Sequence, residues 1–170
     1  EIMNQMSEES RGLAETGKQA SSSITRLVEL STEMEVTITA GALRGFVELA
    51  KADHLVYKFQ IYLVLMGKSE KTSSDFADHH NCRLGKWYFE GDGRDCFSKL
   101  PGFKEMDNPH QKVHTHGHLA IDAFYQKDIE TTLNEIQSME KASQQVLECL
   151  EKMAQAGESD SSLLCNSSKH

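Results

Sequence analysis

This 170-residue chain has little proline and few runs of β-branched residues: it contains only two prolines. Because proline breaks helices and β-branched runs favour strands, their scarcity predicts a mostly helical domain. Long apolar runs are also missing. The longest candidate, Ile61 to Gly67, is far shorter than the roughly 20 residues that span a bilayer. No signal peptide is visible either, so we expect a protein without membrane contact.

The chain also has fewer positive than negative residues, and its cysteines are not spaced as a paired framework. The formal net charge of −8 argues against nucleic acid as a partner. The four cysteines stand at positions 82, 96, 149 and 165 and show no paired spacing, which favours reduced thiols and a cytoplasmic location. Because the chain opens on Glu1 rather than methionine, we expect a fragment of a longer protein.

Residues 1–40 carry a repeat that is typical of a coiled coil. Apolar or small residues recur at alternating steps of three and four, the period of a coiled-coil seam. The alternative is an ordinary amphipathic helix, since several seam positions are small or hydroxylic. The seam positions are Met3, Met6, Ser10, Leu13, Gly17, Ala20, Ile24, Leu27, Ser31, Met34 and Ile38.

Residues 41–156 contain four further helical segments, and residues 157–170 have the Gly, Ser and Asp content of a disordered tail. The first segment, 43–67, ends near Gly67 after the seam fades at Gly41 and Gly45. A short helix follows over 76–89, and then an irregular connection. The sequence predicts an all-α fold, an antiparallel four-helix bundle with an N-terminal coiled-coil lead-in helix.

The last two segments have their own markers. Asn108 and Pro109 predict a helix start, as N-cap and first helical residue, for a helix that continues through Phe124. A final amphipathic segment carries one apolar face. The residues of that face are Ile129, Leu133, Ile136, Ser143, Leu147 and Leu150.

Histidines spaced four apart on the helix after Pro109 indicate a metal site. Residues i and i+4 share a helix face, so His110/His114 or His114/His118 could bind one ion. His110 and His118 lie about 12 Å apart along the axis, too far to share it. His116 points to nearly the opposite side of this helix.

Partners for this histidine pair lie upstream. His54 falls on the apolar stripe of its helix, and Cys82 is a plausible thiolate ligand. His79 and His80 beside Cys82 are rival ligands, because His79 and Cys82 are i and i+3. A core with buried histidines and no metal is the remaining alternative.

The run Cys82-Arg83-Leu84-Gly85-Lys86-Trp87-Tyr88, with Asp53-His54 upstream and Pro109-His110 and Val113-His114 downstream, resembles the chemoreceptor zinc-binding domain. The steps are 28 residues from His54 to Cys82, 28 to His110 and 4 to His114. Residues 1–38 resemble the end of a bacterial chemoreceptor's cytoplasmic coiled coil. The resemblance implies Zn²⁺ held by His54, Cys82, His110 and His114 in a bundle that forms a homodimer.

The resemblance also implies a function. Members of this family are non-enzymatic, zinc-responsive regulators of chemoreceptors or of cyclic di-GMP enzymes. In some members hypochlorous acid oxidises the zinc-bound cysteine, here Cys82. We therefore expect a chemotaxis sensor domain that signals to the upstream chemoreceptor region of the same chain. It would reach the kinase and the coupling protein only indirectly.

Two other functions remain open at this point. A structural zinc clip and dimerisation module would use the same ligands without signalling. A metal-dependent hydrolase needs an open coordination position and a general base, but the chain has no His-Glu-x-x-His motif. We therefore expect no enzyme activity.

Overall fold

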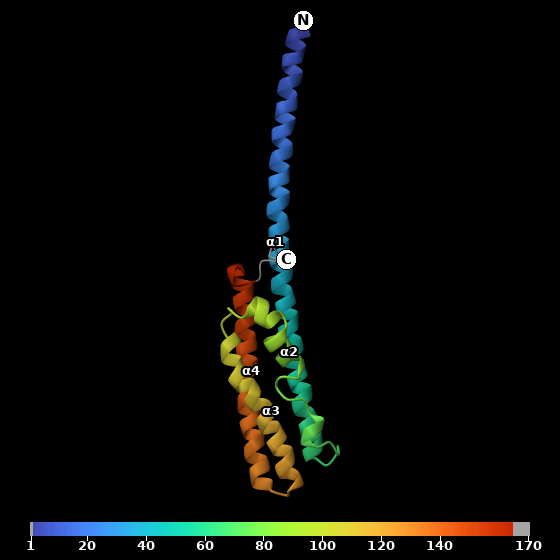
Figure 1. Ribbon diagram of the computed structural model, residues 1–170, viewed down its shortest axis with the longest axis vertical. Coiled ribbons are helices and arrows are strands. Elements are labelled where there is room, and N and C mark those ends of the chain that lie inside the picture. The colour runs from blue at the N-terminus through green and yellow to red at the C-terminus, as the bar shows by residue number, and fades with distance from the viewer. Residues whose placement is uncertain (1, 165–170) are drawn as a thin grey trace. The chain divides into compact units, whose positions relative to one another are not determined.

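The computed structural model describes residues 2–164, and every regular element among them is a helix. The long helices are α1 (Ile2–Leu65), α3 (Phe103–Tyr125) and α4 (Ile129–Ser159), and α2 (Arg83–Glu90) is short (Figure 1). The connections and the C-terminal end contain η1 (Ser73–Asp75), η2 (Gly93–Phe97) and η3 (Ser161–Leu163). The prediction of an all-α helical bundle is confirmed. Within residues 2–164 no helix is long and apolar enough to cross a membrane.

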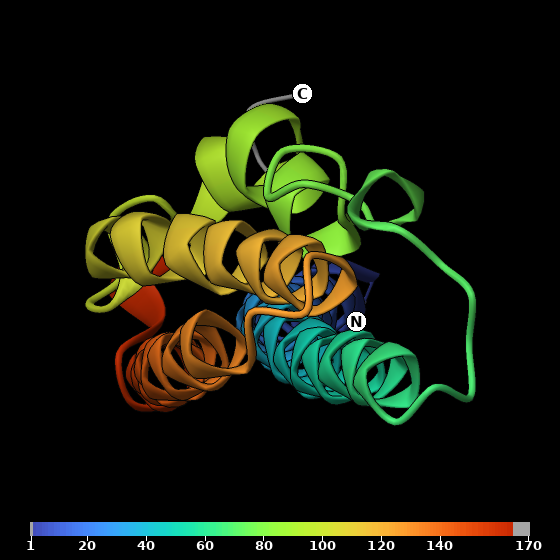
Figure 2. The ribbon, with the colours of Figure 1, turned by 90° about the horizontal axis from the view of Figure 1, so that it is seen from below.

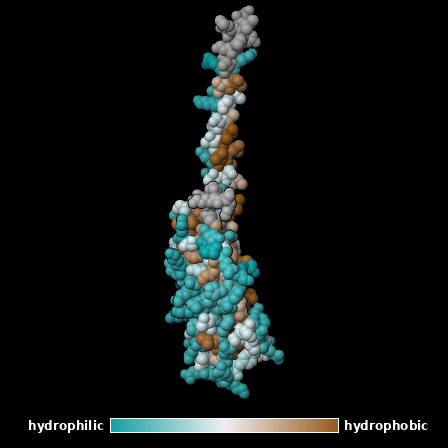
Figure 3. All heavy atoms as spheres, in the orientation of Figure 1, coloured by the Kyte–Doolittle hydropathy of each residue, from teal (hydrophilic) through white to brown (hydrophobic). Residues whose placement is uncertain are grey.

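The chain divides into two compact units after Ile38. The first unit is the N-terminal part of α1, and hydrophobic side chains lie on its surface (Figure 3). Leu27 and Ile38 of the predicted seam are 64% and 67% exposed. A single helix has no core in which to bury such residues. The exposed seam members are Leu13, Ile24, Leu27, Met34 and Ile38.

The second unit, from Thr39 onward, is an up-and-down bundle. α1 and α3 run in the same direction, since His54 lies beside His110 and Ile61 lies beside Gly117. α4 runs the opposite way, because Lys51 pairs with Glu151 whereas Lys58 pairs with Glu140. Figure 2 shows these three helices around a common centre, with residues 66–102 along the outside.

An aromatic cluster attaches α2 to the bundle. The Trp87 ring stacks on Phe46 of α1 at a centroid distance of 4.4 Å and lies 6.0 Å from Phe103 of α3. Tyr88 stacks on Phe103 at 4.3 Å. Aromatic pairs at these distances add stability beyond the area they bury. This cluster fixes α2, and with it the position of Cys82 at its N-terminus.

The core follows the helical period that the sequence predicts for α1, with His54 on the buried face. The prediction for α4 is partly wrong: Ser143 and Leu150 are buried, but Ile129 and Leu133 are 59% and 58% exposed. The buried stripe of α4 is displaced around the helix from the predicted face, so it shares only some residues with that face. The buried residues of α4 include Thr132, Met139, Ala142, Val146, Cys149 and Met153.

Gly41 and Gly45, where the predicted seam fades, lie inside one continuous helix, because α1 runs through them to Leu65. Two helix starts differ from the predicted ones. α2 begins at Arg83, so Cys82 is its N-cap rather than an interior residue. α3 begins at Phe103 after Gly102, whose φ of 91° ends the preceding turn.

The early start of α3 places Pro109 inside the helix, where it has no N–H for the backbone ladder. Buried Phe103 and Met106 extend the helix before the proline, and His110 therefore lies beyond the first turn. The first residues of the predicted disordered tail are structured instead, since α4 runs to Ser159, η3 follows and Leu164 is buried. Residues 165–170, including Cys165, lie outside the described part.

The cysteines only partly match the expected reduced thiols. Cys82 and Cys149 are free, and Cys149 is buried in α4 as a packing residue. Cys96, in η2, is disulfide-bonded. The sequence around it gave no sign of a disulfide.

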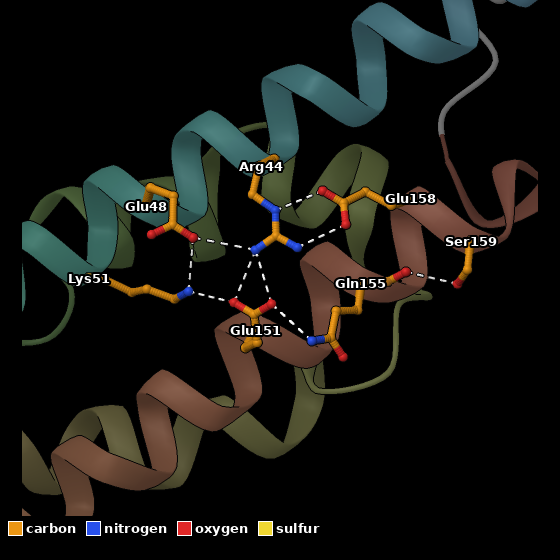
Figure 4. A network of polar contacts seen from close by, with 7 residues as sticks. All are labelled: Arg44, Glu48, Lys51, Glu151, Gln155, Glu158 and Ser159. Carbon is orange, nitrogen blue, oxygen red and sulfur yellow. Dashed lines mark hydrogen bonds and ion pairs between the residues drawn. The ribbon is translucent and has the colours of Figure 1, made fainter.

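A polar network links α1 to the C-terminal half of α4 (Figure 4). The Arg44 guanidinium donates to both Glu151 oxygens, at 3.0 and 3.1 Å, and to both Glu158 oxygens, at 2.7 and 2.9 Å. Lys51 adds a contact to Glu151. These bonds lower the pKa of Glu151 to about 2, the hydrogen bond from Lys51 being the largest cause.

We predict that Glu151→Gln lowers the free energy of unfolding near neutral pH by about 1 kcal/mol, because the network is partly exposed and screened by solvent. The folded-state pKa of Glu151 is depressed, so its contribution exists above the unfolded value of about 4.3 and is lost as the pH falls toward 2. Urea denaturation of both proteins from pH 7 to pH 2 measures the difference.

Glu148→Gln is the control, since Glu148 accepts a hydrogen bond from Gln144 of the same helix. Both proteins contain the same buried histidines. Subtracting the variant's free energy of unfolding from that of the wild type therefore cancels the acid sensitivity that these histidines cause. A difference that does not shrink below pH 4 would contradict the assigned role of Glu151.

Candidate metal centre

His54 and His114 are held in the same way on two helices. Both are buried, with exposed fractions of 4% and 3%. The His54 Nδ1 lies 2.8 Å from the Ala50 carbonyl oxygen, and the His114 Nδ1 lies 2.8 Å from that of Ala77. A carbonyl oxygen only accepts, so each Nδ1 carries the proton and each Nε2 presents a lone pair. Metal-binding imidazoles are commonly oriented by a carbonyl oxygen that accepts the proton of the other ring nitrogen.

The Nε2 atoms of both residues are buried and have no hydrogen-bond partner. A buried acceptor without a partner costs about 1–3 kcal/mol. A metal ion that accepts both lone pairs would offset this cost. Because of these two nitrogen atoms, the residues present fit a metal ion.

His110 completes a cluster of three imidazoles. Ligand atoms of His54, His110 and His114 all lie within 4.8 Å of one another, and no other such group of three or more occurs in the described chain. The ring of His110 lies 5.3 Å from that of His54 and 5.0 Å from that of His114, between centroids. Helix spacing predicted the pair on α3, and the parallel packing of α1 brings the third ring to it.

Burial keeps all three imidazoles neutral. It lowers the pKa of His54, and it lowers the pKa of His110 to about 2 and that of His114 to about 4. The neighbouring imidazoles act in the same direction on His110 and His114, because like charges would repel. Neutral imidazole is the form that coordinates a metal.

Cys82 lies at the edge of this cluster. Its Sγ is 3.2 Å from the His110 Nε2. It is not among the ligand atoms that all lie within 4.8 Å of one another, which come from the three histidines. As the N-cap of α2, the sulfur accepts the Gly85 N–H at 3.3 Å. Burial raises the pKa of the thiol, and the backbone N–H groups of Gly85 and Leu84 oppose that shift. A helix N-terminus favours a thiolate, the form that binds metals.

Gly85 allows the chain to pack closely beside Cys82. A Cβ at this position would lie 1.9 Å from the His79 carbonyl oxygen. Only glycine permits this approach, which explains the glycine in the Cys-x-Leu-Gly run. The contact holds the turn that precedes α2 against the first turn of that helix.

A cavity of about 350 Å³ opens beside the cluster, and His54, Cys82, His114 and Tyr57 line it. An ion pair between Arg83 and Asp53, 2.8 Å long, lies at its wall. Both residues are chain neighbours of predicted ligands. Small molecules from solvent therefore have a route to the Cys82 sulfur.

Three of the other histidines have different surroundings. The His116 Nδ1 lies 2.6 Å from a Glu135 oxygen of α4, which leaves it outside the cluster. His118 likewise does not join it. His80 is exposed, with its ring 4.2 Å from that of Phe89.

Sequence reasoning missed three partners of the site. The Ala50 carbonyl is four residues before His54, a helical spacing that could have indicated it. Tyr57 packs its ring 4.6 Å from that of His114 and is one turn after His54. The Ala77 carbonyl comes from an irregular segment and has no signal in the sequence.

Comparison with protein families bears on this cluster. Residues 54–121 match the family model of the chemoreceptor zinc-binding domain. The match supports a domain of this family within the chain, and it includes all four predicted ligands. No curated protein and no solved structure matches the chain. A zinc-binding domain is therefore supported by the family match and by the histidine cluster.

We predict that Gly85→Ala lowers the free energy of unfolding by about 1–3 kcal/mol, the usual range for overpacking. The added methyl group meets backbone rather than a flexible side chain, so the turn bearing Cys82 must move. Gly45→Ala is the control, because its Cβ would meet nothing within 4 Å in a helix, where alanine is favoured. Urea denaturation should show a loss for the first variant and none for the second.

Proposed function

We propose that this domain binds one zinc ion through His54, Cys82, His110 and His114 and acts as a regulatory, non-enzymatic sensor. The observation that carries the proposal is the buried histidine cluster with two Nε2 atoms that lack partners. The family match supports the choice of zinc over other metals that bind imidazole. The stimulus would be zinc occupancy or oxidation of Cys82.

The protein supplies preorganised ligands from separate elements. Two backbone carbonyls fix the histidine tautomers, and the first turn of α2 presents the sulfur. Bound zinc would link these elements and keep the thiol deprotonated. Since α1 carries His54, α2 follows Cys82 and α3 carries His110 and His114, ligand loss would loosen the packing of three helices.

Oxidation would act on the sulfur that borders the cavity. A Cys82 thiolate and hypochlorous acid give a sulfenic acid and chloride: the sulfur loses two electrons and the chlorine gains them. The sulfenic acid is a weaker ligand than the thiolate. The cavity gives such a small oxidant access, and this observation supports the redox form of the proposal.

We further propose that the output passes along α1 to a homodimeric coiled coil. α1 carries His54, and its residues up to Ile38 bear the exposed apolar seam. A second copy would cover these side chains with the same seam. The coiled coil would belong to the cytoplasmic signalling region of a bacterial chemoreceptor in chemotaxis, and the kinase and coupling protein would be reached only indirectly.

A structural zinc clip is the second candidate, and the buried Nε2 atoms favour it equally. It requires the same ligands but no response. Zinc that does not exchange at cellular free zinc levels would favour the clip, and exchangeable zinc would favour the sensor. Attachment to a cyclic di-GMP enzyme would leave the site chemistry unchanged.

We predict that His114→Ala and Cys82→Ala each lower zinc affinity about tenfold or more, at least as much as loss of an outer-shell partner does. Competition with a chromophoric chelator measures the affinity, and elemental analysis measures the zinc content. His116→Ala is the matched control on α3, since His116 pairs with Glu135. A wild-type protein that binds no zinc, or an equal loss in His116→Ala, would refute the proposed ligands.

We also predict that a cysteine at seam position Leu27 forms a disulfide between two copies, at a rate that zinc removal changes. Glu29→Cys, two residues away and off the seam, should cross-link poorly. Non-reducing gels of the zinc-loaded and zinc-free proteins, beside the parent chain without an added cysteine, measure both effects. Equal rates with and without zinc, and after oxidation of Cys82, would rule out signalling through α1.

A further inference from the structure

A fourth imidazole, that of His79, lies next to the cluster. Its ring centroid is 6.1 Å from that of His110, and the two rings meet edge to face. The rings of His54 and His114 are also 6.1 Å apart, and their nitrogens do belong to the cluster. The separation of His79 from His110 is therefore within the range found among the cluster's own members.

His79 and Cys82 are presented by the same short turn. The Cys82 N–H donates to the Asp78 carbonyl at 3.1 Å, and the Asp78 carboxylate accepts the N–H groups of His80 and Asn81 at 2.9 Å. The His79 carbonyl is held by the close approach of Gly85. A stable turn thus carries two metal-ligating side chains three residues apart.

Cys82 is the predicted ligand most easily removed. It is only half-buried and borders the cavity, whereas the three clustered histidines are buried. Its sulfur approaches one imidazole of the cluster rather than all three. Zinc accepts imidazole nitrogen as well as thiolate sulfur, so a neighbouring histidine is a chemically suitable replacement.

We propose that His79 is an alternative metal ligand, which completes the site when the Cys82 sulfur is no longer available. The proposal rests on the proposed zinc site and adds a second ligand set, His54, His79, His110 and His114. A change in the side-chain torsions of His79 brings its ring from the edge of His110 toward the cluster. The site then has two ligand states, with sulfur or with a fourth nitrogen.

The second state has a distinct charge. Exchange of a thiolate for a neutral imidazole raises the net charge of the loaded site by one unit. Removal of the sulfur would therefore change the electrostatics of the site while the metal stays in place. A sensor of this kind reports loss of the thiolate without releasing its zinc.

The test measures zinc affinity in a double-mutant cycle on the full chain, by chelator competition with Zn²⁺ alone. The proteins are wild type, His79→Gln, Cys82→Ala and Cys82→Ala/His79→Gln, with Cys82→Ala/His80→Gln as the matched control. His79→Gln alone should leave the affinity unchanged. In the Cys82→Ala background it should lower the affinity about tenfold or more, a non-additive effect that marks direct coupling.

Histidine ring ¹⁵N NMR gives a second readout. One ring nitrogen of His79 should shift on zinc binding to Cys82→Ala but not on binding to wild type. Cys82→Ser serves if the alanine variant does not fold. Equal affinities of Cys82→Ala with and without His79, or no retained zinc in either Cys82 variant, would overturn the inference. Failure of wild type to bind zinc would instead overturn the proposed function.

Discussion

Three neutral imidazoles buried between parallel helices are the constraint on which this structure depends. Their burial is unfavourable for two reasons: the polar rings lose their hydration, and two Nε2 atoms have no hydrogen-bond partner. Two backbone carbonyls offset part of this by accepting the Nδ1 protons. The Nε2 atoms of His54 and His114 keep free lone pairs, and ligand atoms of all three histidines lie within 4.8 Å of one another, so the arrangement favours a cation there.

The rest of the domain positions this cluster. Residues 66–102 lead the chain back along the bundle, so that α3 runs parallel to α1. His54 therefore lies beside His110 and His114. The aromatic contacts of Trp87 hold α2, and the N-terminus of α2 presents Cys82. The ion pairs of Arg44, Lys51 and Lys58 bind α4 to α1 on the outside.

The four predicted ligands are not equivalent in the structure. The histidines are buried, preorganised and close together, whereas Cys82 is half-buried and contacts one of them. In the proposed site, the nitrogen ligands would then supply most of the affinity and the sulfur would be the reactive ligand. The proposed role of His79 rests on the same difference, because the turn that presents the sulfur carries an imidazole beside the cluster.

The sequence by itself determined the helical class, the apolar stripe that includes His54, and the pair on α3, because each depends on a local period of about 3.6 residues. The Cys-x-Leu-Gly run identified Cys82 through resemblance, while the need for Gly85 appears only in the approach of the His79 carbonyl. The start of α3 at Phe103 and the buried face of α4 were decided by packing, since the buried stripe of α4 is displaced from the face that its sequence predicts. Only the tertiary structure decided that three imidazoles meet and that the Ala77 carbonyl orients one of them, because contacts between distant segments leave no periodic trace in a single chain.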